Sequence, residues 1–141
     1  MPLVRRLSHV CLGTTDLEHL IAFYEKLLEA RVIHEFRNPA GFRYGALLAL
    51  APGTFLELFN EPDPEARSGK GLFRHFCFEV EDIEAMAAHV RTMGLTPEVK
   101  RGRTDRTLQF TIADPDGVPS VRRPVRAVSL CLREFRWHEH I

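Results

Sequence analysis

The sequence lacks the features that mark several large classes of protein. It has no apolar run near the roughly 20 residues that a membrane-spanning helix needs. Its first ten residues, "MPLVRRLSHV", contain no apolar segment of the signal-peptide kind. Its 19 Lys and Arg residues balance its 19 Asp and Glu residues, so there is no field of one sign to attract nucleic acid or an anionic membrane. We therefore expect a cytoplasmic protein that binds neither nucleic acid nor membrane.

Cysteine is also scarce. Cys11, Cys77 and Cys131 are odd in number and far apart, which excludes a dense disulfide framework and favours reduced thiols in a reducing compartment. The chain has 141 residues, of which 45% are hydrophobic and 27% charged, and this is enough to bury one good core. A single domain with a local binding site is therefore expected.

The chain contains an internal repeat. The segment "SHVCLGTTDLEHL" (8–20) resembles "RHFCFEVEDIEAM" (74–86) at an offset of 66 residues. The matched pairs are His9 and His75, Cys11 and Cys77, Asp16 and Asp82, and Glu18 and Glu84. Both segments then continue with apolar residues at the i, i+3, i+4, i+7 spacing of a helix that packs on a core. These residues are Leu17, Leu20, Ile21, Tyr24 and Leu27 in the first copy and Ile83, Met86, Ala87, Val90 and Met93 in the second. We infer a duplicated structural module.

Capping residues give each expected helix its ends. Thr15 or Asp16 can cap the first helix while Glu18 reaches back to the cap, and Asp82 can cap the second. Gly94 is placed to end the second helix in a left-handed turn. Short β-prone runs surround the helices, so each module is expected in the order β-α-β-β-β. The modules span 1–60 and 71–125, with a Pro- and Gly-rich linker over 61–70 and an atypical tail over 126–141.

Four features together resemble the vicinal oxygen chelate superfamily. They are the paired modules, a histidine in the first strand of each, a glutamate in the last strand of the first, and "DPDG" before the last strand of the second. This superfamily contains glyoxalase I, bleomycin-resistance proteins, extradiol dioxygenases, fosfomycin-resistance enzymes and methylmalonyl-CoA epimerase. The resemblance covers residues 7–117. It implies an α+β fold, in which two tandem βαβββ modules form a cupped, open mixed sheet that holds one divalent metal on its concave side. It also implies a homodimer, whose sites can combine strands of two chains.

The resemblance places His9, Glu57 and His75 on three of the four metal-ligand positions. Imidazole nitrogen and carboxylate oxygen suit Zn, Ni, Fe, Co or Mn. A lone strand histidine is more often a hydrogen-bonded ring of the core, but the duplication favours a ligand pair. Alternation in "TFLELF" puts Glu57 on one strand face with Phe55 and Phe59, where a carboxylate is costly to bury unless something pairs with it.

Other polar residues receive no ligand role. Cys11 and Cys77 lie two residues beyond the histidines and so share their strand face, yet we interpret them as small buried apolar residues. His19, His34 and His89 fall outside the repeat equivalences and are interpreted as solvated.

The fourth ligand position breaks the superfamily pattern. Counting from "DPDG" places Val121 there, whereas the 66-residue offset places Arg123 opposite Glu57, and neither side chain can bind a cation. Pro119 and Pro124 also disfavour a central strand at this point. In one explanation "AVSLCLREF" supplies the last strand, and the missing group is Glu134, Glu139, His138 or His140. In the other, a reading-frame change near residue 118 makes the ending foreign.

Three functions are compatible with these residues. The first is a metal-dependent lyase or isomerase like glyoxalase I, acting on a small oxygen-chelating substrate, with Glu57 as the base and activity weakened by the missing ligand. The second is a non-catalytic small-molecule-binding protein like the bleomycin-resistance proteins. The third is an extradiol dioxygenase, which also needs a carboxylate late in the chain.

Overall fold

The chain divides into two compact units, residues 1–68 and 69–141, which we call the N-terminal and C-terminal units and describe separately. The structure, a computed structural model, describes residues 6–63, 75–103, 106, 108–117 and 129–133. Within these ranges no helix has the length and apolar character needed to cross a membrane.

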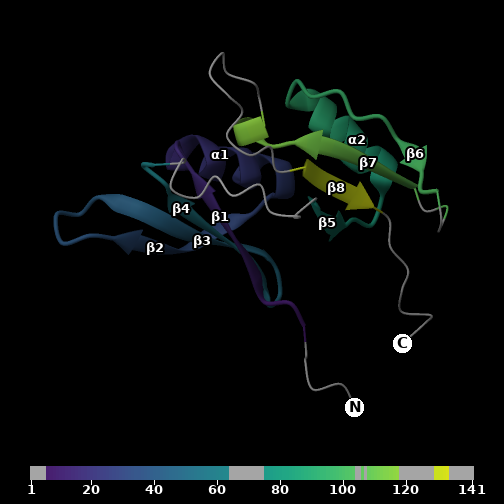
Figure 1. The fold of residues 1–141 in the computed structure, drawn as a ribbon. Coiled ribbons are helices and arrows are strands. Elements are labelled where there is room, and N and C mark those ends of the chain that lie inside the picture. Colours follow the sequence, from purple (N-terminus) through teal and green to yellow (C-terminus); the bar gives the residue numbers. More distant parts are fainter. Residues whose placement is uncertain (1–5, 64–74, 104–105, 107, 118–128, 134–141) are drawn as a thin grey trace. The chain divides into compact units, whose positions relative to one another are not determined.

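The N-terminal unit is a four-stranded mixed sheet with one helix on it (Figure 1). Its elements are β1 (His9–Thr14), α1 (Leu17–Leu28), β2 (Arg31–Arg37), β3 (Arg43–Ala51) and β4 (Thr54–Asn60). The strand order is β1-β4-β3-β2, with β1 parallel to β4 and the remaining pairs antiparallel. The predicted order β-α-β-β-β is confirmed for this half of the chain.

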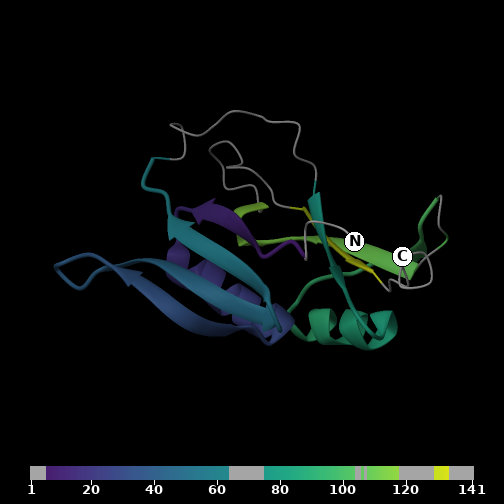
Figure 2. The ribbon, with the colours of Figure 1, turned by 90° about the horizontal axis from the view of Figure 1, so that it is seen from below.

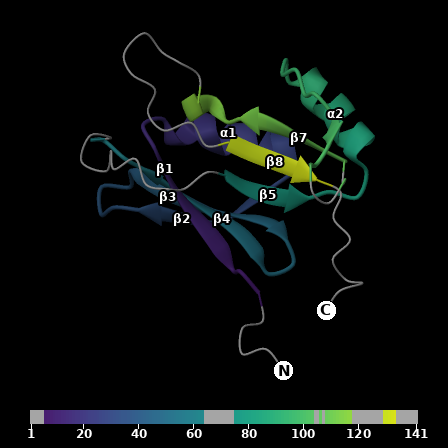
Figure 3. The same cartoon turned by 45° about the vertical axis from the view of Figure 1, so that its right-hand side comes forward.

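The C-terminal unit repeats this topology. Its elements are β5 (His75–Glu79), α2 (Ile83–Thr92), β6 (Lys100–Arg101), β7 (Leu108–Ala113), a 3-10 turn (Pro115–Gly117) and β8 (Ser129–Arg133). The strand order is β5-β8-β7-β6, and β8 runs between β5 and β7 in Figure 3. The first strand and the helix of each unit begin 66 residues apart. The predicted duplication and the α+β fold class are therefore confirmed.

Each helix begins at the expected aspartate. The Asp16 carboxylate accepts a hydrogen bond from the His19 N–H at 3.1 Å, and the Asp82 carboxylate accepts from two N–H groups at the start of α2. Such a cap is worth about 1 kcal/mol. Gly94 has φ of +81° just after α2, which confirms the left-handed turn. The expectation that Glu18 reaches back to its cap is wrong, because its carboxylate pairs with Arg43 of β3 instead.

Each helix covers one face of its sheet. Figure 2 shows α1 along the sheet of the N-terminal unit. The apolar residues predicted for this helix face are buried, and they pack with buried sheet residues. The sheet residues are Leu12, Ala46, Leu48, Leu56 and Leu58. In the C-terminal unit, Ile83, Ala87 and Val90 of α2 are buried, as are Phe110, Ile112 and Leu132 of the sheet.

We call the opposite side of each sheet its open face. By strand alternation, the open face of the N-terminal unit carries His9, Cys11, Leu47, Phe55, Glu57 and Phe59, all of them exposed or half-buried. The open face of the C-terminal unit carries Cys77 and Thr111, both of them exposed.

The last strand of the C-terminal unit comes from the segment interpreted above as a tail. β8 pairs in parallel with β5 and antiparallel with β7. This pairing agrees with the explanation in which "AVSLCLREF" supplies the last strand. Six residues discussed for the fourth ligand position lie outside the described residues, namely Val121, Arg123, Glu134, His138, Glu139 and His140.

Candidate functional site

His9 is the first residue of β1 and is exposed on the open face of the N-terminal unit. Its backbone lies opposite Phe55 of the parallel strand β4. The ring Nδ1 is 3.3 Å from the Ser8 hydroxyl, a contact that leaves the other ring nitrogen available to a further partner. A strand histidine held by a neighbour at one nitrogen can still ligate a metal through the other.

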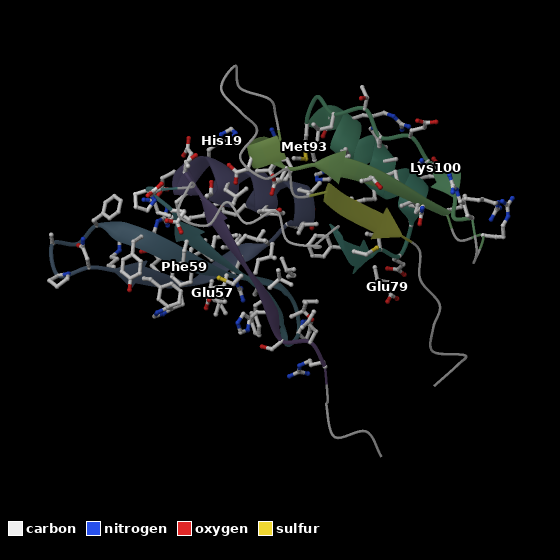
Figure 4. The ribbon with its side chains drawn as sticks, in the orientation of Figure 1. His19, Glu57, Phe59, Glu79, Met93 and Lys100 are labelled. Atoms are coloured by element: carbon white, nitrogen blue, oxygen red, sulfur yellow. The ribbon has the colours of Figure 1, made fainter. Side chains whose placement is uncertain are left out.

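Glu57 occupies the middle of the same face. Its backbone lies between Cys11 of β1 and Leu47 of β3, and the side chain is half-buried. Figure 4 shows Glu57 and Phe59 on the side of the sheet away from α1. Across the described part of the chain, no residue forms a hydrogen bond or salt bridge with the Glu57 carboxylate. A half-buried anion beside apolar side chains is disfavoured unless a cation or donor joins it, so this position fits a metal ligand.

Cys11 and Cys77 do not behave as the sequence suggested. Both lie on the open face of their unit, as expected from strand alternation. However, their interpretation as buried apolar residues is wrong, because both are exposed. In the N-terminal unit Cys11 is the register partner of Glu57, so a thiol lies next to the candidate ligand.

An aromatic cluster lies beside Glu57 on the open face. It consists of His34, Phe36, Tyr44 and Phe59. The Phe36 ring lies 5.0 Å from the Phe59 ring and 4.7 Å from the His34 ring between centroids, while Tyr44 stacks on Phe59 at 6.1 Å. Tyr44 joins this face because the β2–β3 register shifts between Phe36 and Arg37. The alternation of "VIHEF" could have predicted His34 on the same face as Phe36. The bulge that brings Tyr44 to this face has no signal in the sequence.

Gly45 permits the position of the Phe59 ring. The two residues are register partners on β3 and β4, and a Cβ atom added at Gly45 would lie 2.5 Å from Phe59 Cε1. No real Cβ approaches a ring atom so closely, so any larger residue displaces the ring. The absence of a side chain at Gly45 therefore allows the Phe59 ring to lie in the aromatic cluster next to Glu57.

The opposite face carries a charge network that ties α1 to the sheet. Arg43 pairs with Glu18 of α1 and with Glu35 of β2, the latter at 2.6 Å. Hydrogen bonds from Arg37 and Arg43 lower the pKa of the Glu35 carboxyl, and the Glu18 carboxylate raises the pKa of Arg43. The charges of this network are satisfied by one another on the helix face, which distinguishes them from Glu57 on the open face.

His75 belongs to the C-terminal unit, where its backbone is the first residue of β5 and pairs with Ser129 of β8. It therefore occupies in its unit the strand position that His9 occupies in the other. No group of three or more His, Cys, Asp or Glu side chains in the described ranges is arranged to hold a metal ion. Within the described side chains, His9 and Glu57 are therefore not joined by a third candidate ligand.

Known proteins of similar sequence or structure identify the family to which this fold belongs. YaeR, an uncharacterized protein of Escherichia coli (strain K12), is 31% identical over 121 residues, which are 82% of this chain and 93% of YaeR. The crystal structure of a glyoxalase family protein from Enterococcus faecalis has a TM-score of 0.71 and 23% identity, covering 92% of this chain and 98% of that chain.

A variant of the fosfomycin resistance protein FosX from Listeria monocytogenes, crystallised with Mn(II) and 1S,2S-dihydroxypropylphosphonic acid, has a TM-score of 0.63 and 15% identity. It covers 97% of this chain and 98% of that chain. Residues 6–119 also match a protein family, and they include both candidate histidines and Glu57. The chain therefore belongs to the Glyoxalase/Bleomycin resistance protein/Dioxygenase superfamily.

Proposed function

We propose that this protein is a metal-dependent lyase or isomerase of the glyoxalase I kind, acting on a small substrate with oxygens on neighbouring carbons. His9, Glu57 and His75 hold one divalent metal ion, of the Zn, Ni, Fe, Co or Mn group. The observation that carries the proposal is the half-buried Glu57 carboxylate, which has no hydrogen bond or salt bridge within the described residues. Membership of the superfamily supports the same assignment.

A divalent ion held by these three residues would supply a Lewis acid for the substrate oxygens, which would make the adjacent C–H bond easier to ionise. The protein residues supply the remaining chemistry. His9 and His75 bind the ion as neutral imidazoles, so each ring must be deprotonated at its ligating nitrogen. Glu57 would detach from the ion to accept the substrate proton and return it to the neighbouring carbon, so no external base is consumed. The aromatic cluster gives Glu57 a largely apolar neighbour surface on the open face.

Turnover of the hemithioacetal of methylglyoxal and glutathione tests this proposal. Protein stripped with a chelator and then reloaded with Zn²⁺, Ni²⁺ or Co²⁺ should regain isomerisation, and the metal-free protein should lack it. Glu57→Gln removes the proton acceptor and keeps the side-chain shape, so kcat should fall about a hundredfold to ten-thousandfold. The exposed Glu98→Gln variant is the matched control and should keep wild-type kcat. Equal rates for the two variants would exclude Glu57 as the base.

A second candidate function is binding of a small molecule without turnover. The partly exposed aromatic cluster favours it, because Tyr44 is 41% exposed and stacks on Phe59, forming a flat apolar surface of the kind that binds planar ligands. Binding of an aromatic probe that is weakened by Phe59→Leu, together with no isomerisation by the metal-loaded protein, would favour this function.

The proposal includes a homodimer in the cytoplasm, where exposed thiols such as Cys11 stay reduced. In such a dimer, His9 and Glu57 of one chain can share a metal with the partner subunit's His75. Mixing a His9→Ala chain with a His75→Ala chain distinguishes the two arrangements. If sites form between chains, the mixed dimer regains one intact site and part of the metal binding. If sites form within chains, mixing restores nothing. A monomer in light scattering at micromolar concentration would contradict the dimer.

A further inference from the structure

The β2–β3 hairpin contains a bulge at Tyr44. Phe36 pairs with Gly45, and the next pair along the hairpin is Arg37 with Arg43, so Tyr44 has no register partner on β2. Strict alternation would place Arg43 on the same face as Gly45 and Tyr44 on the opposite face. The extra residue of the bulge exchanges these two positions. Tyr44 therefore lies on the open face with Phe36, and Arg43 lies on the helix face.

Two carboxylates hold Arg43 on the helix face of the N-terminal unit. The guanidinium group donates to Glu18 of α1 through Nε, at 3.0 Å, and through one terminal nitrogen. Its other terminal nitrogen donates to Glu35 of β2 at 2.6 Å. A planar fork with three of its donors in use has a fixed direction, which a longer or more flexible side chain would lack. Loss of the bulge would turn Arg43 to the open face and break all three hydrogen bonds.

On the open face, the Tyr44 ring extends the aromatic cluster toward solvent. It is 41% exposed and lies nearly parallel to the Phe59 ring, at an interplanar angle of 19°. Phe59 follows Glu57 by two residues on β4, so their Cα atoms are about 7 Å apart. The register partner of Phe59 on β1 is Gly13, which adds no side chain to this face. An exposed ring surface therefore lies within the length of a small substrate from Glu57.

We propose that Arg43 is a positioning residue, which holds Tyr44 on the open face through Glu18 and Glu35, and that Tyr44 there selects substrates with a planar aromatic group. This inference rests on the proposed function, because it names the group that the substrate carries next to its neighbouring oxygens. A phenyl group can stack on the exposed Tyr44 ring, which strengthens binding by about twofold to tenfold. A methyl group at the same position has no ring face to stack.

Fluorine NMR of the full-length protein labelled with 3-fluorotyrosine tests the positioning role without an activity assay. The chain has only two tyrosines, and Tyr24 is fully buried, so it reports whether each variant is folded. A soluble gadolinium chelate should broaden the Tyr44 signal and leave the Tyr24 signal sharp. Phe59→Leu removes a neighbouring ring and should move the Tyr44 signal, and Arg43→Gln should move it as well. Arg31→Gln, which changes an exposed cation of β2, is the matched control and should leave it in place.

Titration of the labelled wild-type protein with mandelate and lactate tests the selectivity without turnover or a variant. Both anions carry oxygens on neighbouring carbons, and they differ only in a phenyl or a methyl group. With Zn²⁺ present, mandelate should move the Tyr44 signal along a saturable curve and leave the Tyr24 signal unmoved. Lactate should bind about twofold to tenfold more weakly.

Turnover gives a third measurement, in which the hemithioacetals of phenylglyoxal and methylglyoxal with glutathione are compared. The ratio of kcat/KM for the phenyl substrate to kcat/KM for the methyl substrate should fall about twofold to tenfold in Tyr44→Leu and in Arg43→Gln. The double variant should show no further fall, because Arg43 acts through Tyr44. A merely structural role of Arg43 would lower both kcat/KM values together and leave their ratio unchanged.

The outcomes separate this inference from the proposed function. A Tyr44 signal that the chelate does not broaden would show that the face is covered in solution and would overturn the inference. A Tyr44 signal unmoved by mandelate, or a wild-type Tyr44 signal in Arg43→Gln, would overturn it even if both hemithioacetals are turned over. Absence of turnover of either hemithioacetal, while mandelate still moves the Tyr44 signal, would overturn the proposed function and support the role of Arg43 and Tyr44 in ligand binding.

Discussion

Replacing Glu57 with leucine should stabilise the metal-free protein. The carboxylate is half-buried between Phe55 and Phe59, and none of the described residues pairs with it. An unpaired polar group that is fully buried costs about 1–3 kcal/mol. For a half-buried group we take about half of this, so Glu57→Leu should raise the free energy of unfolding by about 0.5–1.5 kcal/mol. In a chain of this length that corresponds to a melting temperature about 2–6 °C higher.

Binding of Zn²⁺ should reverse this order, so that the wild-type protein becomes more stable than Glu57→Leu. At a Zn²⁺ concentration a hundred times the dissociation constant, binding adds about 2.7 kcal/mol to the wild-type protein, which exceeds the gain expected from leucine. Thermal denaturation followed by circular dichroism, with chelator and then with Zn²⁺, measures both effects. Glu98→Leu, which changes an exposed carboxylate, is the control and should shift stability by no more than about 0.5 kcal/mol in either condition. A lower melting temperature for metal-free Glu57→Leu, or equal stabilisation of the variant and the wild type by Zn²⁺, would refute the reasoning.

Three further outcomes follow from the fold. Gly45→Ala should destabilise the protein by about 1–3 kcal/mol in urea denaturation, because the new methyl group displaces the Phe59 ring, and adding Phe59→Leu should recover part of the loss. Asp82→Ala removes the acceptor for two N–H groups of α2 and should lower the free energy of unfolding by about 1 kcal/mol. An alanine substitution at an exposed position outside the cap should leave the free energy of unfolding unchanged. The pKa of Glu35 is lowered chiefly by its hydrogen bond with Arg37, so its stabilisation is present above the ordinary carboxyl pKa and is lost as pH falls through the lowered value. Urea midpoints measured between pH 7 and pH 2 should therefore fall less in Glu35→Gln than in the wild type.

The repeat predicted most of the fold because its signals are local. Helical spacing and the aspartates at 16 and 82 fix where each helix begins, and both act within a few residues of the chain. The alternation of "TFLELF" likewise put Glu57 on one face with its two phenylalanines, and the structure agrees. A pattern of this kind depends only on strand geometry, so no tertiary information was needed.

The remaining features depend on pairing between distant segments. The last strand could not be located by an offset of 66 residues, since β8 begins at Ser129 and is identified only by its hydrogen bonds to β5 and β7. Tyr44 reaches the open face only because of the bulge between β2 and β3. The exposure of Cys11 likewise depends on what covers the sheet, which residue type alone does not reveal.

Calorimetric titration of the metal-free protein with Zn²⁺ tests the proposed site most directly. The proposal predicts one ion bound per chain, with an affinity that falls at least about tenfold in each of His9→Ala, Glu57→Ala and His75→Ala. His19→Ala, which removes an exposed histidine of α1, should bind Zn²⁺ as the wild type does. Wild-type affinity in the His9→Ala and His75→Ala proteins would contradict the metal site on which the proposed function depends.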